Sequence, residues 1–377
     1  MDLELNEEQL MLRDALRRLL ETECTTQHVR KMENDPVGYS PELWRALSEM
    51  GLAGLTIAED AGGSGQSAIE LAIVHEELGR ALCPSPLLES SVIAAELLMC
   101  VGSAEQKKQW LPVIANGEAV LVPAWLEPGN GFGPRGVRLP AVAGAGGIIL
   151  SGVKFCVPFA AAARRLLVLA RTGRADRDID ILMVDPKASG VSMTQLRTMD
   201  GDAQYEVTFD GVIVKESDRI GGRGQGWAWW GAAMNSANIA LGAWAVGCGT
   251  RAHELATQYA KERVQFGRPI GSFQAMSHPL ANIAMELEGA RALVLQAAWA
   301  SAEGKPFSHL PAMAKLNAEA ACTHATAMAH QVFGGIGFTV DIDVQLFFRR
   351  ARQNRFAWGT ANDLRETIAA SILDGEH

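Results

Sequence analysis

The sequence predicts a mostly helical protein with a central β-domain, on three observations. Apolar residues recur at helical spacing in the first third of the chain, and this spacing returns after residue 223. Between these stretches, short apolar clusters are separated by glycine and proline, as is typical of strands. We therefore expect an N-terminal α-helical domain over 1–117, a middle β-domain over 118–223 and a C-terminal helical bundle over 224–377.

The N-terminal segment carries two leucine-rich stretches at helical spacing, over 10–20 and over 71–82. Asn6 comes directly before Glu7 and Glu8. An asparagine side chain accepts hydrogen bonds from the first free amides of a helix, and the helix dipole favours carboxylates in its first turn. Asn6 is thus expected to cap the first helix.

The middle segment changes to short apolar runs at 148–150 and 166–169, which predict strands. Tyr205, Val207 and Phe209 alternate with polar residues, as in a half-buried strand. The pair Asp210–Gly211 follows at once, and this dipeptide is typical of hairpin turns. We expect the chain to reverse there into a second strand that begins at Val212.

The C-terminal segment returns to long amphipathic stretches over 240–263, 280–302 and 310–332. Alanine-rich faces in the last of these allow helices to approach closely, and they need no functional explanation. A helical bundle is the expected arrangement.

Charge and composition exclude several classes of function. The formal charge of −9 provides no basic field for nucleic acid or anionic membrane surfaces. No window approaches the roughly 18 apolar residues of a membrane span. The six cysteines are scattered, the histidines lack metal-ligand spacing, and no charged-then-apolar leader precedes Leu5. We expect a cytoplasmic protein without a metal site.

Three strings in the last third of the chain could carry chemistry: Glu262–Ile270 with Phe273–Gln274, then Gln331–Phe338, then Trp358–Asn362. A guanidinium such as Arg263 at a helix end suits a phosphate, and Gly334–Gly335 lets a backbone approach a ligand closely. Taken singly, the arginine would more often be a surface ion-pair residue, and the two glycines a helix-terminating turn.

Other strings stand in the first third of the chain. They run over residues 5–13, 43–52, 58–63, 76–80 and 105–118. In order and spacing, all these strings together resemble the acyl-CoA dehydrogenase family over essentially the whole chain. The resemblance implies a barrel-like middle domain, a C-terminal four-helix bundle, a tetramer, and FAD bound with residues lent by a neighbouring protomer. It also implies a carboxylate that removes the α-proton of a CoA thioester while hydride passes to the flavin.

The sequence departs from the family at that carboxylate. The family's Glu-Gly-Thr string matches Trp358–Thr360 here, so tryptophan stands at the base position. The alternative family position falls within Met234–Asn238, which holds no carboxylate either. Because an indole offers only an N–H donor, Trp358 cannot accept the proton. The sequence therefore assigns no catalytic residue to this chain.

Residues that face a protomer's own flavin and substrate in the family are also changed. The loop over 126–132 keeps Glu127–Pro128 but loses its hydroxyl residues. The family's Trp-Ile-Thr string is matched by Cys156–Pro158, and proline removes both a hydroxyl and a backbone donor. Asn235 and Asn238 stand where an aspartate and an arginine often contact the acyl-CoA.

By contrast, the residues that the family lends to a neighbour's FAD are retained. The resemblance assigns cofactor binding to Arg263, Phe266, Gln274, Gln331, Val332, Phe333, Gly334, Gly335, Thr360 and Asn362. A chain with only the lent half is consistent with a subunit of a heteromeric acyl-CoA dehydrogenase, α2β2 by analogy. A second, similar subunit would supply the glutamate, and an electron acceptor would follow. The resemblance to heteromers of bacterial steroid catabolism suggests a steroid-derived CoA thioester.

Two alternatives remain open at the level of sequence. The chain could be a homomeric flavoenzyme with a base relocated to Asp363, Glu366 or Glu127, although Glu127 in its Glu-Pro pair is more typical of a structural role. It could also be a non-catalytic protein that binds an acyl-CoA or a partner.

Overall fold

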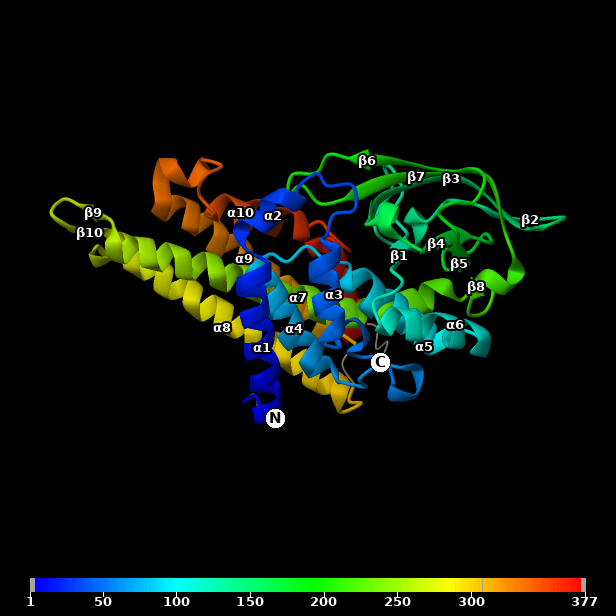
Figure 1. The fold of residues 1–377 in the computed structure, drawn as a ribbon, viewed down its shortest axis with the longest axis horizontal. Helices are drawn as coiled ribbons and strands as arrows, with labels where there is room; N and C mark the ends of the chain where they lie inside the picture. Colours follow the sequence, from blue (N-terminus) through cyan, green and yellow to red (C-terminus); the bar gives the residue numbers. More distant parts are fainter. Residues whose placement is uncertain (1–3, 307, 374–377) are drawn as a thin grey trace. The chain divides into compact units, whose positions relative to one another are not determined.

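The computed structural model describes residues 4–306 and 308–373, and its chain forms two compact units. The first unit comprises 1–30, 67–83 and 238–377, and the second comprises 31–66 and 84–237. Helices at the start, strands in the middle and helices at the end agree with the fold class expected from the sequence (Figure 1). The domain boundaries that we expect after residues 117 and 223 stay predictions.

The first unit is helical. Asn6 accepts from the Gln9 amide, and the Gln9 side chain accepts from the Asn6 amide, so the predicted cap is confirmed as a reciprocal capping box. Helix α8 packs on α9, which also contacts α10 and α11, and a two-stranded hairpin joins α7 to α8. The elements are α1 (Glu7–Glu23), α2 (Thr26–Met32), α4 (Ala68–Ala81), α7 (Gly226–Glu262), β9 (Val264–Gln265), β10 (Arg268–Pro269), α8 (Gln274–Ala302), α9 (Leu310–Phe333), α10 (Val344–Asn354) and α11 (Ala361–Leu373), of which α2 after residue 30 and α7 before residue 238 are counted with the second unit.

Helix α4 holds this unit together through one short string. Glu76 accepts from Arg291 of α8 at 2.9 Å, and Arg80 donates to both oxygens of Glu254 of α7 at 2.6 Å. At Gly79, an added Cβ would lie 2.0 Å from the carbonyl oxygen of Trp244 on α7. The glycine therefore lets two helices approach to backbone contact while the arginines fix their register.

The second unit contains two four-stranded sheets with a set of short helices. One sheet has the order β1-β4-β5-β8 and the other β2-β3-β7-β6. The runs predicted at 148–150 and 166–169 lie within strands β3 and β4, as expected. The elements are α3 (Pro41–Glu49), α5 (Ala95–Val101), α6 (Ala104–Ala115), β1 (Leu121–Ala124), β2 (Ala141–Gly144), β3 (Gly147–Pro158), β4 (Arg165–Arg171), β5 (Ile179–Val184), β6 (Val191–Leu196), β7 (Gln204–Val214) and β8 (Arg219–Ile220).

The hairpin predicted at Asp210–Gly211 is wrong. Strand β7 continues through both residues and pairs with β3 on either side of them, Val212 with Leu150 and Phe209 with Gly152. Two residues of β7 thus face the single residue Ser151, which is a β-bulge. Gly211 has φ +63°, the left-handed conformation that a bulge and a hairpin turn both require, so the local signal cannot separate them.

A π-helix, η3 (Leu87–Ala94), runs through the second unit and buries a carboxyl group. Glu89 is only 6% exposed, and its Oε2 accepts no hydrogen bond from the described residues. Burial raises the pKa of Glu89 to about 8, and the nearby charge of Asp202 acts in the same direction. Glu89 is therefore neutral in the folded protein at neutral pH.

In the part of the chain that the structure covers, no helix is both long and apolar enough to cross a membrane.

Glu89 makes stability depend on pH in a predictable direction. Because its folded pKa lies above its unfolded value, the folded state binds the proton more tightly, and stability falls as pH rises from about 5 to about 8. We expect the free energy of unfolding of the unsubstituted protein to fall by about 4 kcal/mol over this range because of Glu89, and we expect Glu89→Gln to abolish this fall. Urea unfolding at both pH values measures it, with exposed Glu49→Gln as control. An unchanged pH slope in Glu89→Gln would contradict the prediction.

Candidate functional site

Trp358 lies between α10 and α11 in a strained backbone conformation. Its φ is +58°, in the left-handed region that a bulky residue adopts only when its surroundings impose it. The side chain is half-buried and the following residue, Gly359, is buried. The segment that carries Trp358 is therefore held in place by other parts of the structure.

Lys315 of α9 holds that segment. Its Nζ donates to the carbonyl oxygens of Ala357 at 2.9 Å, of Trp358 at 3.4 Å and of Gly359 at 3.2 Å. The Lys315 side chain is completely buried, and burial lowers the pKa of its ammonium. Three converging carbonyls replace the water that a buried cation loses, so the lysine fixes the path of the backbone on both sides of Trp358.

Glu319 lies one turn further along α9, with an oxygen 3.5 Å from the Lys315 Nζ. Neither Glu319 oxygen accepts a hydrogen bond within the described residues. Burial raises the pKa of Glu319 to about 7, while the Lys315 charge opposes that rise. The attraction between Lys315 and Glu319 thus offsets only part of the cost of burying their charges, so desolvation decides the direction of both pKa shifts. Sequence reasoning missed it, although lysine and glutamate four residues apart on an alanine-rich helix were a visible signal.

Thr360 and Asn362 begin α11. The Thr360 amide and hydroxyl both donate to Asp363 Oδ2, and Asn362 Oδ1 accepts from Arg365 at 3.1 Å. Asp363 therefore caps the start of α11, and its Oδ2 is already engaged by the two Thr360 donors. Glu366 is exposed on the next turn.

The remaining predicted residues gather at the other end of α9. Phe333, the last residue of α9, stacks on Tyr259 of α7 with ring centres 4.3 Å apart. Arg263 is exposed four residues after Tyr259, and its carbonyl accepts from the Ile270 amide across the β9–β10 hairpin. Phe266, at the hairpin tip, is 92% exposed and meets Phe273 edge-on, directly before exposed Gln274. The chain thus places the ends of α7 and α9 and the start of α8 together.

Gly334 and Gly335 follow Phe333. The backbone conformation at position 334, with φ +63° and ψ −142°, is by itself enough to require glycine there. Gly335 has no left-handed φ, and an added Cβ there would meet nothing within 4 Å. Neither conformation nor packing thus requires glycine at 335, which fits a close approach by a ligand. Gln331 is exposed, whereas Val332 is buried and presents no side chain to a ligand.

The predicted set is thereby split into two groups. Lys315, which holds the Trp358 segment, and Phe333 are 18 residues apart on α9, or about 27 Å at the helical rise. Thr360 and Asn362 belong to the first end, and Arg263, Phe266, Gln274 and Gln331–Gly335 to the second. The two groups lie at opposite ends of one helix.

In the second unit, Phe132 of the altered loop over 126–132 packs in a group of aromatic side chains with two tryptophans from outside the loop. Trp125 packs against Trp230 at 5.2 Å and against Phe132 at 5.6 Å between ring centres. Trp230 is 2% exposed. Trp125 between these two rings leaves little space for a planar ligand where the family's flavin-facing loop stands. These residues do not fit an isoalloxazine ring bound by this chain itself.

Glu127 is fully engaged in this unit. It accepts from the Lys154 Nζ at 2.7 Å and from the amides of Arg138 and Leu139 at 2.9 and 2.8 Å. Burial lowers the pKa of Lys154 to about 8, and the Glu127 carboxylate acts in the opposite direction. A carboxylate that holds a buried lysine and two backbone amides has a structural role, so the geometry argues against Glu127 as a relocated base.

On α7, Asn238 is 8% exposed and its Oδ1 accepts no hydrogen bond from the described residues, whereas Asn235 is half-buried. Over 4–306 and 308–373, no three histidine, cysteine or acidic side chains are grouped to hold a metal ion.

Comparison with known proteins decides the family. Family models match the N-terminal domain at 6–118, the middle domain at 124–212 and the C-terminal domain at 224–373 of acyl-CoA dehydrogenases. The chain belongs to the acyl-CoA dehydrogenase family. It is 31% identical to the probable acyl-CoA dehydrogenase YngJ of Bacillus subtilis, over 99% of this chain and 100% of that protein. Members of this family use FAD.

Three solved structures are also similar to this chain in sequence and fold. A chain of the ChsE4–ChsE5 complex of Mycobacterium tuberculosis is 28% identical with a TM-score of 0.89, and each chain is covered to 100%. A chain of a variant of the Tcur3481–Tcur3483 steroid acyl-CoA dehydrogenase is 31% identical with a TM-score of 0.87 and 98% coverage of both chains. PigA with FAD and proline is 25% identical with a TM-score of 0.91, covering 99% of each.

Breaking the buried pair tests the support of the Trp358 segment. Lys315→Met leaves Glu319 buried without its cation and three carbonyls without their donor, so we expect a loss of about 3 to 5 kcal/mol of stability. The loss should be larger at pH 8 than at pH 5, because Glu319 regains neutrality by binding a proton at low pH. Denaturant unfolding measures both effects.

The double variant Lys315→Met/Glu319→Leu is the matched control, since it removes both charges and should recover part of the stability. An equal loss at both pH values, with no recovery in the double variant, would show that the ion pair is not the cause.

Proposed function

We propose that this chain is the base-lacking subunit of a heteromeric FAD-dependent acyl-CoA dehydrogenase. It lends the adenosine and diphosphate half of an FAD site to a second, similar subunit in an α2β2 assembly. That partner supplies the catalytic glutamate and the isoalloxazine pocket, and an electron acceptor reoxidises the flavin. The reaction is the α,β-dehydrogenation of a CoA thioester, and this chain alone is inactive.

The observation that carries the proposal is the tryptophan at the position that matches the family's base, in a segment whose backbone Lys315 holds in place. Lys315 still fixes the backbone around Trp358, yet the side chain presented is an indole, which accepts no proton. Two of the three carboxylates that could replace it are engaged elsewhere, Glu127 by Lys154 and Asp363 by Thr360, while the third, Glu366, is exposed on α11. This supports a partner's carboxylate over a relocated base of this chain.

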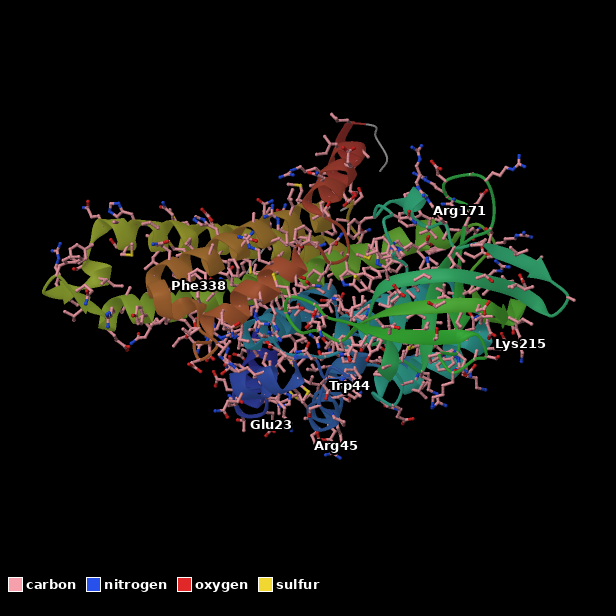
Figure 2. All side chains as sticks on the ribbon, turned by 90° about the horizontal axis from the view of Figure 1, so that it is seen from above. Glu23, Trp44, Arg45, Arg171, Lys215 and Phe338 are labelled. Carbon is pink, nitrogen blue, oxygen red and sulfur yellow. The ribbon has the colours of Figure 1, made fainter. Side chains whose placement is uncertain are left out.

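The second support is the exposed group at the far end of α9. Arg263 provides a cation for a diphosphate, and Gly335 leaves the backbone open. Large apolar side chains beside this group are also exposed to solvent, both in the β9–β10 hairpin and in the segment after Gly335 that carries Phe338 (Figure 2). Exposed apolar surface of this kind marks an interaction site. These side chains are Val264, Phe266, Ile336, Phe338 and Val340.

The similarity to chains of the ChsE4–ChsE5 complex and of a steroid acyl-CoA dehydrogenase supports a heteromer and a steroid-derived thioester as its substrate. All six cysteines are free thiols, which supports a location in the cytoplasm.

Flavin stoichiometry tests the proposal. The chain purified together with the dehydrogenase-like product of an adjacent gene should contain about one FAD for every two chains, because only one of each pair completes an isoalloxazine pocket. Absorbance of the flavin against chain concentration measures it. One flavin per chain in the protein purified alone, bleached by an acyl-CoA, would establish the homomeric alternative, and a colourless complex would establish the non-catalytic one.

Arg263→Ala tests the lent half-site. Removing the guanidinium from a phosphate contact should cost about 1.5 to 3 kcal/mol of flavin binding and lower the flavin content of the complex. Lys261→Ala, an exposed cation on the same helix end, is the matched control and should keep the flavin. Equal flavin content in both variants would count against Arg263 as a ligand.

A further inference from the structure

The segment 336–343 carries the chain from the 3-10 helix η8 (Gly334–Phe338) into α10, all within the first unit. Its side chains Ile336, Phe338 and Val340 are 44%, 76% and 75% exposed. Phe338, labelled in Figure 2, meets the His330 ring of α9 edge-on, with ring centres 5.1 Å apart. Because side chains that remain in solvent bury little apolar area, these three contribute little to holding the segment in place.

Arg30 of α2 holds this segment through polar contacts. Its Nη1 donates to Asp343 Oδ1 at 2.7 Å, and its Nη2 donates to the Val340 carbonyl oxygen at 3.0 Å. A longer contact, 3.4 Å from Nη1 to the Thr26 carbonyl oxygen, joins the guanidinium to its own helix one turn earlier. The guanidinium is planar and its donors are fixed relative to one another, so it holds the segment at two points at once.

Asp343 is committed to this contact instead of to its own helix. It stands directly before α10, where an aspartate side chain normally accepts from the first free amides, yet it accepts from none of the described amides of that helix. The Arg30 and Asp343 side chains are 29% and 38% exposed, and ion pairs at such exposure contribute little to overall stability. A pair that forgoes a helix cap and stabilises the fold so little is explained by where it holds the chain.

We propose that Arg30 is a positioning residue for the half-site that this chain lends. By holding the Val340 carbonyl and the Asp343 carboxylate, it fixes the path of the chain directly after Gly335 and presents Phe338 in one place. A segment that is already ordered loses less conformational entropy on association than a mobile one, so this contact strengthens the binding of the subunit and flavin that the segment faces. The inference rests on the proposed function for the identity of that subunit.

Arg30→Gln in the full chain alone tests whether the contact orders the segment. Hydrogen exchange read by mass spectrometry should be about tenfold faster in peptides over 336–343, because two donors no longer oppose local opening. The unfolding temperature should fall by less than about 3 °C. The matched control is Arg165→Gln, because Arg165 is 28% exposed and likewise donates to a carbonyl and a carboxylate, those of Arg164 and Asp185.

The same variants in complex with the dehydrogenase-like product of the adjacent gene test the positioning role. Titration with FAD, followed by flavin fluorescence, should give an affinity about tenfold lower for Arg30→Gln. Arg30→Lys keeps the charge and one of the two contacts with the segment, so it should recover part of the affinity. Arg165→Gln should bind FAD as the unsubstituted chain does.

Faster exchange and weaker FAD binding in Arg30→Gln, with the unfolding temperature inside that range, support the positioning role. Unchanged exchange, unchanged FAD affinity, a larger fall in unfolding temperature or an equal effect in Arg165→Gln overturns it.

Failure of the proposed function gives a different result. If the unsubstituted chain binds FAD only without that partner, the heteromer is wrong, and the variants are compared on FAD bound by the chain alone, where a second copy faces the segment. A chain that binds FAD in neither form overturns both proposals.

Discussion

The geometry of the candidate site depends on one buried ammonium group. Lys315 has lost its water and regains hydrogen bonds from the carbonyls of residues 357–359, so those carbonyls converge on it. That requirement imposes the left-handed conformation of Trp358, which a tryptophan would not adopt by itself. The backbone that positions a side chain at this point is therefore held in place, and the side chain that it carries is an indole, which accepts no proton.

The length of α9 sets the second constraint. A rigid helix keeps Lys315, which holds the Trp358 segment, about 27 Å from Phe333, beside which the Arg263 group lies, and no side-chain movement closes that gap. Mutations at one end can therefore remove a function there without disturbing the other end. This separation is consistent with the proposed loss of a base at one end and with an arginine, exposed aromatic side chains and open glycines at the other.

Local signals predicted much of the fold and less of the site. The cap at Asn6 and the strands over 148–150 and 166–169 follow from neighbours a few residues away, so sequence spacing reveals them. Asp210–Gly211 was misleading because a bulge and a turn place the same demand on glycine, and only the partner strand distinguishes them. The contact of Gly79 with Trp244 joins residues 165 positions apart, and nothing local specifies it.

The carboxylates show why loss of the base is hard to reverse within this chain. Glu127 holds a buried lysine and two backbone amides, and Asp363 holds the first turn of α11, so recruiting either as a base would leave its donors unsatisfied. Glu319 is buried with Lys315 behind the Trp358 segment and is occupied in offsetting that charge. Each of these three acidic groups thus already stabilises part of the fold. In the proposed heteromer the proton acceptor comes from another chain, and the exposed apolar end of the bundle is a surface that this chain offers to it.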